Sequence, residues 1–157
     1  MKQLQNIIAA SLFLFSLTAA AQQDKGSWRA ASTTARSITG DVLLSEEKLS
    51  IDFVNFPMSR VRTLQASEVS AVFDADTTAA GTGSLYRITI SSSKKFLHHN
   101  SLCGSDDTQW MVTYVTGRSL QVAFFSSQKP PSSPSTPSPT PPTSAAPSPT
   151  PSKAVLL

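Results

Sequence analysis

The composition of the chain changes twice along its length, and only the middle section can form a hydrophobic core. A short apolar leader, residues 1–21, precedes a section of mixed composition, residues 22–128, and a low-complexity tail rich in Pro, Ser and Thr follows at 129–157. The middle section is long enough for one domain that buries roughly two-thirds of its unfolded surface. We therefore expect a single folded domain between two segments that contribute nothing to its core.

The leader has the features of a secretory signal peptide. Lys2 supplies a positive charge, residues 7–17 are mostly apolar, and Ala19-x-Ala21 offers the small residues that signal peptidase requires. This pattern predicts cleavage after Ala21 and export, to the periplasm or the extracellular space of a bacterium. A membrane anchor is the alternative, but it takes ~20 apolar residues. No other stretch is apolar enough, so we expect no transmembrane helix in the mature form.

The charge of the middle section is balanced. The whole chain carries 13 Lys and Arg against 10 Asp and Glu, a net charge of +3. Lys2, Lys129 and Lys153 lie in the leader and the tail, so residues 22–128 hold 10 of each sign and are neutral. A neutral domain has no electrostatic footprint for a phosphate backbone. We expect no nucleic-acid partner.

Apolar residues recur with a period of two through the middle section, which is the spacing of strands with one face in a core and the other in water. Further strands are expected near Trp28, at 60–64, at 69–73 and near Phe96, with short links at 45–48 and 116–118 that are typical of hairpins. The sequence predicts an all-β domain, a small antiparallel barrel of about eight strands, with a β-sandwich as the alternative. The alternating sets are Ile38, Gly40, Val42 and Leu44; Leu49, Ile51 and Phe53; Tyr86, Ile88 and Ile90; Trp110, Val112 and Tyr114; and Leu120, Val122 and Phe124.

Two short motifs carry a resemblance to known proteins. Gly26-Ser27-Trp28 resembles the Gly-x-Trp that opens the lipocalin and wider calycin barrels. The resemblance implies that Trp28 packs across the base of a barrel under an arginine from near the final strand. Arg118 precedes the last strand, which is not quite the family position. Leu102-Cys103-Gly104 and the strands that follow resemble small exported bacterial β-barrel proteins of unassigned function.

Residues that could carry chemistry are few. The two adjacent histidines, His98 and His99, and the single cysteine, Cys103, are the candidates for metal ligands. A structural zinc site would show a second close pair of ligands, which this sequence lacks, so we predict no metal and no other cofactor. One cysteine permits no intrachain disulfide, and its apolar setting predicts a buried thiol. No Gly-x-Ser-x-Gly elbow occurs, so we predict no catalytic residues and no enzyme activity.

The tail is predicted to remain disordered. Residues 129–153 contain ten Pro and eleven Ser or Thr, with no aromatic residue and no acid. Such a segment cannot bury enough apolar area to offset the entropy of ordering it. We therefore interpret the tail as a solvated spacer.

Two functional classes follow from these observations. The domain is a non-catalytic binding or protein-interaction module, with a small apolar ligand or another protein as its partner. The alternative is a structural, envelope-associated protein that its tail spaces from a surface. A barrel interior filled by Trp28, Trp110, Tyr114 and Phe124 would leave no room for a ligand, and we predict that filled interior.

Overall fold

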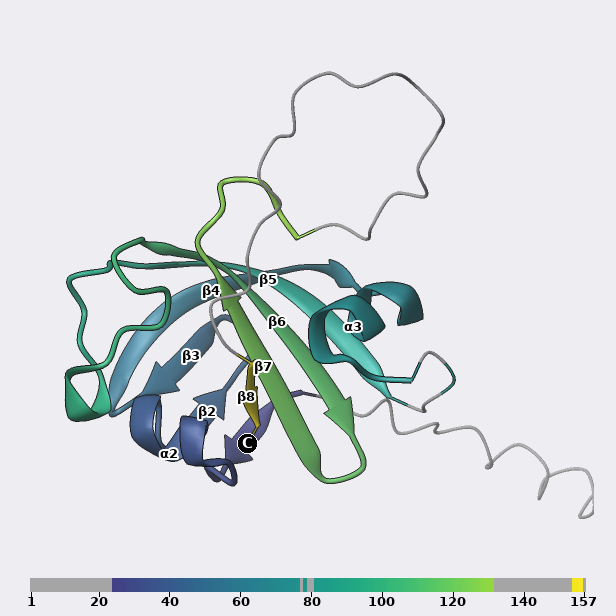
Figure 1. The fold of residues 1–157 in the computed structure, drawn as a ribbon, viewed down its shortest axis with the longest axis horizontal. Coiled ribbons are helices and arrows are strands. Elements are labelled where there is room, and N and C mark those ends of the chain that lie inside the picture. The colour runs from purple at the N-terminus through teal and green to yellow at the C-terminus, as the bar shows by residue number, and fades with distance from the viewer. Residues whose placement is uncertain (1–23, 77, 79–80, 132–153, 157) are drawn as a thin grey trace, which may run out of the picture.

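Eight strands pair in chain order to form one antiparallel meander that curls into a half-barrel (Figure 1). The computed structural model describes residues 24–76, 78, 81–131 and 154–156. Within them, β1 pairs only with β2 and β8 only with β7, so the sheet stays open. The all-β antiparallel prediction is confirmed. The strands are β1 (Gly26–Trp28), β2 (Val42–Leu44), β3 (Lys48–Ile51), β4 (Val54–Thr63), β5 (Thr82–Ile90), β6 (Thr108–Thr116), β7 (Ser119–Phe125) and β8 (Ala154–Leu156).

Helices replace two of the predicted strands. The segment predicted as a strand at 69–73 belongs to α3 (Ala66–Phe73), and Phe96 precedes the 3₁₀ helix η2 (Leu97–His99). A capping box begins α3, because the Gln65 side chain accepts from the backbone at Glu68 while the Glu68 side chain accepts from the Gln65 backbone. These reciprocal bonds satisfy N–H groups that a helix end leaves without a partner, and they stabilise a helix over the apolar run that follows.

A third helix shortens the strand predicted from Ile38. The segment Thr33–Ile38 forms α2, and the Ser32 side chain caps it by accepting from Ala35 N at 3.0 Å. Gly40 then turns the chain with φ +62°, and β2 begins at Val42. Ile38 nevertheless reaches the core, as its apolar character predicted, because it lies on the buried side of α2.

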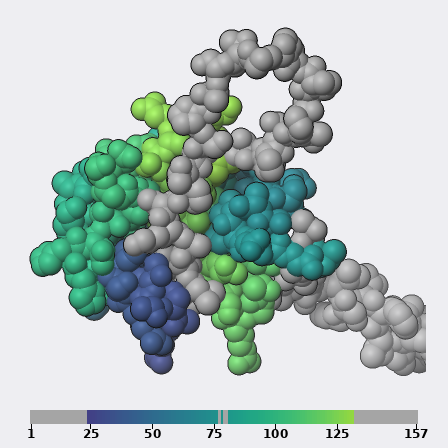
Figure 2. Space-filling view, viewed as in Figure 1, coloured from purple at the N-terminus to yellow at the C-terminus, as the bar shows by residue number. Residues whose placement is uncertain are grey.

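The sheet is covered on both faces over β5, β6 and β7. One core lies inside the half-barrel, where α2 also contributes Ala35 and Ile38. A second core, which includes Leu85, Val112 and Ala123, lies on the outer face beneath α3. The expectation that one face of each strand meets water is therefore wrong for these three strands. In the space-filling view, α2 and α3 occupy separate parts of the surface (Figure 2).

Both predicted hairpin links are confirmed. Residues 45–47 join β2 to β3, where Ser45 N donates to Lys48 O at 2.9 Å. Gly117 lies in the link between β6 and β7 with φ +57°, a conformation that glycine adopts without steric cost.

The end of the chain returns to the domain. In β8, Ala154, Val155 and Leu156 pair antiparallel with Ala123, Val122 and Gln121 of β7. Within the tail predicted to be disordered, 129–157, the structure describes residues 154–156 as a strand. The rest of that prediction from 132 to 153, and the signal peptide with its cleavage after Ala21, lie outside the described residues.

Candidate binding surface

Side chains occupy the interior of the half-barrel. Phe124 is buried in the inner core and Trp28 packs against it. Trp110 and Tyr114 belong instead to the outer core, so the prediction that they fill the barrel is wrong. Their alternation along β6 does place them on one face, but the period alone does not say which face of the sheet is inside.

A buried carboxylate organises the polar contacts of the inner core. Tyr86 Oη donates to Asp24 Oδ2 at 2.6 Å and Thr113 Oγ1 donates to the same oxygen at 2.8 Å. Trp28 Nε1 donates to the backbone oxygen of Asp24 at 2.9 Å. Burial raises the pKa of Tyr86 above its ordinary value, and the bond to Asp24 and its charge raise it further. These bonds tie the segment ahead of β1 to β5 and β6, which is a structural role.

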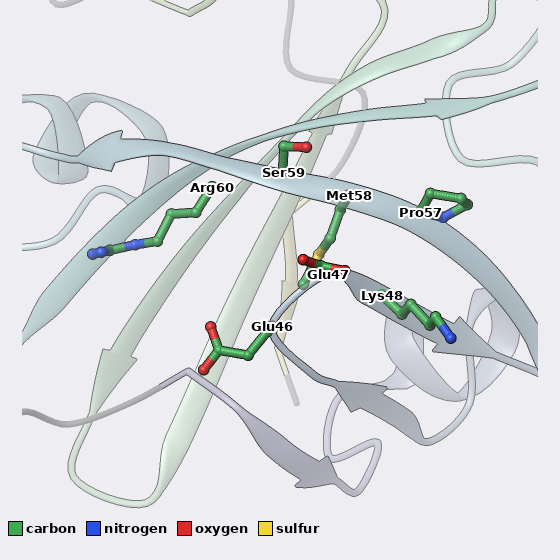
Figure 3. A pocket seen from close by; sticks show the side chains of 7 residues that line it. All are labelled: Glu46, Glu47, Lys48, Pro57, Met58, Ser59 and Arg60. Carbon is green, nitrogen blue, oxygen red and sulfur yellow. The ribbon is translucent and has the colours of Figure 1, made fainter.

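A charged groove of about 500 Å³ lies between the β2–β3 link and β4 (Figure 3). Glu46, Glu47, Lys48 and Arg60 line it with two charges of each sign. Glu46 already forms an ion pair with Lys25, and Arg60 donates to two neutral hydroxyls, Thr63 Oγ1 at 3.0 Å and Ser84 Oγ at 3.3 Å. Arg60 and Lys48 lie toward opposite ends of the groove (Figure 3). The lining has no net charge and therefore no preference for an anion or a cation.

A second groove, of about 640 Å³, combines apolar side chains with carboxylates. It lies over β2 and β3, beside the turn that joins β3 to β4. Among its lining residues, Leu43 is 48% exposed and Phe53 is 100% exposed. The lining set is Ser27, Thr39, Gly40, Asp41, Val42, Leu43, Ser50, Asp52, Phe53, Asn55 and Leu97. We call this site the Phe53 groove.

The Phe53 side chain is exposed to solvent and does not stabilise the fold by packing. The alternation of Leu49, Ile51 and Phe53 predicted a buried side chain, and that prediction is wrong because β3 ends at Ile51. Asp52 and Phe53 form a two-residue turn with φ +49° and +61°. Such turns favour Asn and Gly, since a left-handed residue with a Cβ costs about 1–2 kcal/mol. Backbone strain of this kind clusters at functional sites, which makes Phe53 a candidate contact residue.

The charged side chains that line the Phe53 groove are all acidic. Its described lining contains two carboxylates, Asp41 and Asp52, and neither Lys nor Arg. Asp41 Oδ1 accepts from Ala30 N at 2.8 Å, which holds that carboxylate at the edge of the groove. The site therefore offers apolar area beside negative charge.

The metal-ligand candidates do not form a site in the described part of the chain, which holds no group of three or more His, Cys, Asp or Glu suited to a metal. His98 and His99 are exposed in η2, and His98 Nδ1 lies 3.3 Å from Ser37 O. Cys103 is buried, as predicted, and its Sγ accepts from Thr108 Oγ1 at 3.3 Å. Arg118, the arginine considered for the calycin-like packing, is exposed in the β6–β7 link. An arginine does lie over a tryptophan elsewhere, with Arg87 Cζ 4.6 Å from the ring centroid of Trp110.

Comparison with models of known families, with curated proteins and with solved structures gave no match. Among the described residues, no helix has the length and apolar character needed to cross a bilayer.

Proposed function

We propose that this protein is an exported, non-catalytic binding module that recognises another protein through the Phe53 groove. The observation that carries the proposal is Phe53 itself, whose side chain is 100% exposed on a left-handed backbone. An aromatic residue in this position destabilises the turn and exposes apolar area, so its benefit lies in contact with a partner. Aromatic residues are also enriched among the few side chains that dominate binding energy.

The chemistry of the groove defines the kind of partner. Phe53 and Leu43 offer apolar contact, and Asp41 and Asp52 offer negative charge at the same site. Complementary charges steer association and select among partners. We therefore expect a protein segment that combines an aliphatic side chain with an adjacent Lys or Arg.

The other functional readings have less support. A small ligand inside the half-barrel would compete with the buried side chains of the inner core. A spacer role for the tail has less support because residues 154–156 pair with β7 of the domain. A structural, envelope-associated role is the second proposal, and we propose no enzymatic role.

A peptide titration tests the proposal. The probes are two short peptides that differ only in charge, one with Leu between two Arg and one with Leu between two Glu. We expect the Arg peptide to bind the full chain in a salt-sensitive way, with amide NMR shifts centred on Leu43 and Phe53. Phe53→Ala should weaken that binding at least tenfold, while Arg118→Ala, an exposed control in the β6–β7 link, should not change it. Equal binding of the two peptides, or binding that Phe53→Ala leaves intact, would overturn the proposal.

A further inference from the structure

A third large apolar side chain is exposed, and its surroundings are opposite in charge to the Phe53 groove. The exposed large apolar residues of the described chain are Leu43, Phe53 and Val61. Val61 is 52% exposed and lies between Arg60 and Arg62 in β4. The same chain thus presents an aliphatic residue flanked by cations, which is the chemistry that the groove selects.

The backbone presents Val61 at an irregular edge of the sheet. The β4–β5 register shifts between Arg60 and Arg62, so Val61 has no opposite residue in β5. On its other side, β4 pairs with β3 only from Val54 to Pro57. The Val61 segment therefore lies on an unpaired edge, which is a common place for association between chains.

The two arginines differ in how much charge they offer. Arg62 forms two hydrogen bonds of 2.7 Å with the Glu68 carboxylate, which neutralises much of its charge. The hydrogen-bond acceptors of Arg60 are the neutral hydroxyls of Thr63 and Ser84, which hold the side chain without cancelling its charge. Of the two arginines, Arg60 therefore keeps more of its charge for a carboxylate on another molecule, although Glu46 and Glu47 line the same groove.

We propose that the partner of the Phe53 groove is a second copy of this chain, which presents Val61 and Arg60 to the groove of its neighbour. The inference rests on the proposed function and names its partner. Val61 contacts Phe53 and Leu43 of the neighbour, and Arg60 pairs with the carboxylates Asp41 and Asp52. Because one surface is a groove and the other an edge, the contact is heterologous, and copies associate head to tail. Exposed ion pairs contribute little individually, so the association is weak and depends on concentration and salt.

A complementation experiment tests this arrangement by sedimentation velocity on the full chain over a range of concentrations. Phe53→Ala removes the groove and keeps the Val61 edge, whereas Val61→Glu removes the edge and keeps the groove. Each variant alone should remain monomeric at concentrations where the wild type self-associates. A mixture of the two should form a 1:1 dimer and nothing larger, because only one productive contact is left.

Controls make each outcome decisive. Far-UV circular dichroism checks that both variants fold, and Arg60→Glu gives a second edge variant that should also be monomeric. Arg118→Ala should associate like the wild type. A wild type that stays monomeric up to millimolar concentration would overturn this inference, and the proposed function would stand if the Arg peptide still bound the groove. A mixture that stays monomeric beside a self-associating wild type would also overturn it.

Discussion

Replacement of Phe53 by glycine should stabilise the domain and abolish its binding at the same time. Phe53 has φ +61° and is 100% exposed, so its side chain adds strain without packing on the domain. Most substitutions lower stability, and relief of strain at a functional site can raise stability at the expense of function. An increase in stability at this position would show that Phe53 costs the fold stability, and the loss of binding would show that its side chain contacts another molecule.

The size of the effect follows from two opposing contributions. Relief of the left-handed strain is worth about 1–2 kcal/mol, because glycine has no Cβ. Glycine also loses more backbone freedom on folding than other residues, which costs about 0.5–1 kcal/mol. The substitution removes no buried area, since the side chain is fully exposed. The net gain is between zero and about 1.5 kcal/mol, and its midpoint of about 0.75 kcal/mol corresponds to a rise in Tm of about 3–6 °C for a domain of this size.

Thermal and urea unfolding of the wild type, Phe53→Gly and Phe53→Ala measure this effect. Alanine keeps a Cβ in the left-handed region, so Phe53→Ala should lie within about 0.5 kcal/mol of the wild type. Both variants should also bind the peptide with Leu between two Arg more weakly than the wild type does. A lower Tm for Phe53→Gly, or a loss of about 2 kcal/mol or more for Phe53→Ala, would show that the ring packs on the domain and would refute the reasoning.

Three further predictions concern the fold. Because the pKa of Tyr86 is raised, the folded state keeps the tyrosine proton above pH 10, where the unfolded tyrosine ionises. The free energy of unfolding of the wild type should therefore fall relative to that of Tyr86→Phe above pH 10, by up to about 1.4 kcal/mol per pH unit. A difference between the two proteins that stays constant with pH in urea unfolding would contradict this. Gly83→Ala would place a Cβ 2.6 Å from Val69 Cγ2 of α3, so it should cost about 1–3 kcal/mol of unfolding free energy, and an unchanged Tm would refute the contact. Deletion of 154–157 should speed hydrogen exchange of the amides in Gln121–Ala123 that face β8, and unchanged exchange rates would argue against that pairing.

Sequence reasoning was most successful where a strand is long and its alternation is local. Tyr86, Ile88 and Ile90 are buried on one face of β5, as their spacing predicted. Leu120, Val122 and Phe124 are likewise buried together on β7. Period-two alternation is a property of neighbouring residues along one strand, so it needs no knowledge of the rest of the fold.

Prediction failed where short apolar runs were ambiguous. The residues at 69–73 fit a strand by composition, but the capping box of Gln65 and Glu68 makes them part of α3. The corresponding sequence, Gln65-x-x-Glu68, lacks the Ser or Thr that usually begins a capping box, so it gave only a weak indication of the helix. Phe53 continues an alternating set, which predicts a buried side chain, although the strand ends two residues earlier. Asp52 before Phe53 is a weak sign of a turn, and only the fold showed where β3 ends.

The all-β class, the hairpin links and the neutral charge of the domain follow from the amino-acid sequence alone, because these depend on composition and on neighbours along the chain. Which faces of the sheet are covered depends on the tertiary structure. Helix α3 buries the outer face of β5 to β7, and Trp110 lies in that outer core and not in the interior of the half-barrel. It also joined Asp24 to Tyr86, which lies 62 positions away, and exposed Phe53 beside Asp41. Contacts between distant segments form only when the sheet curls, so no local pattern records them.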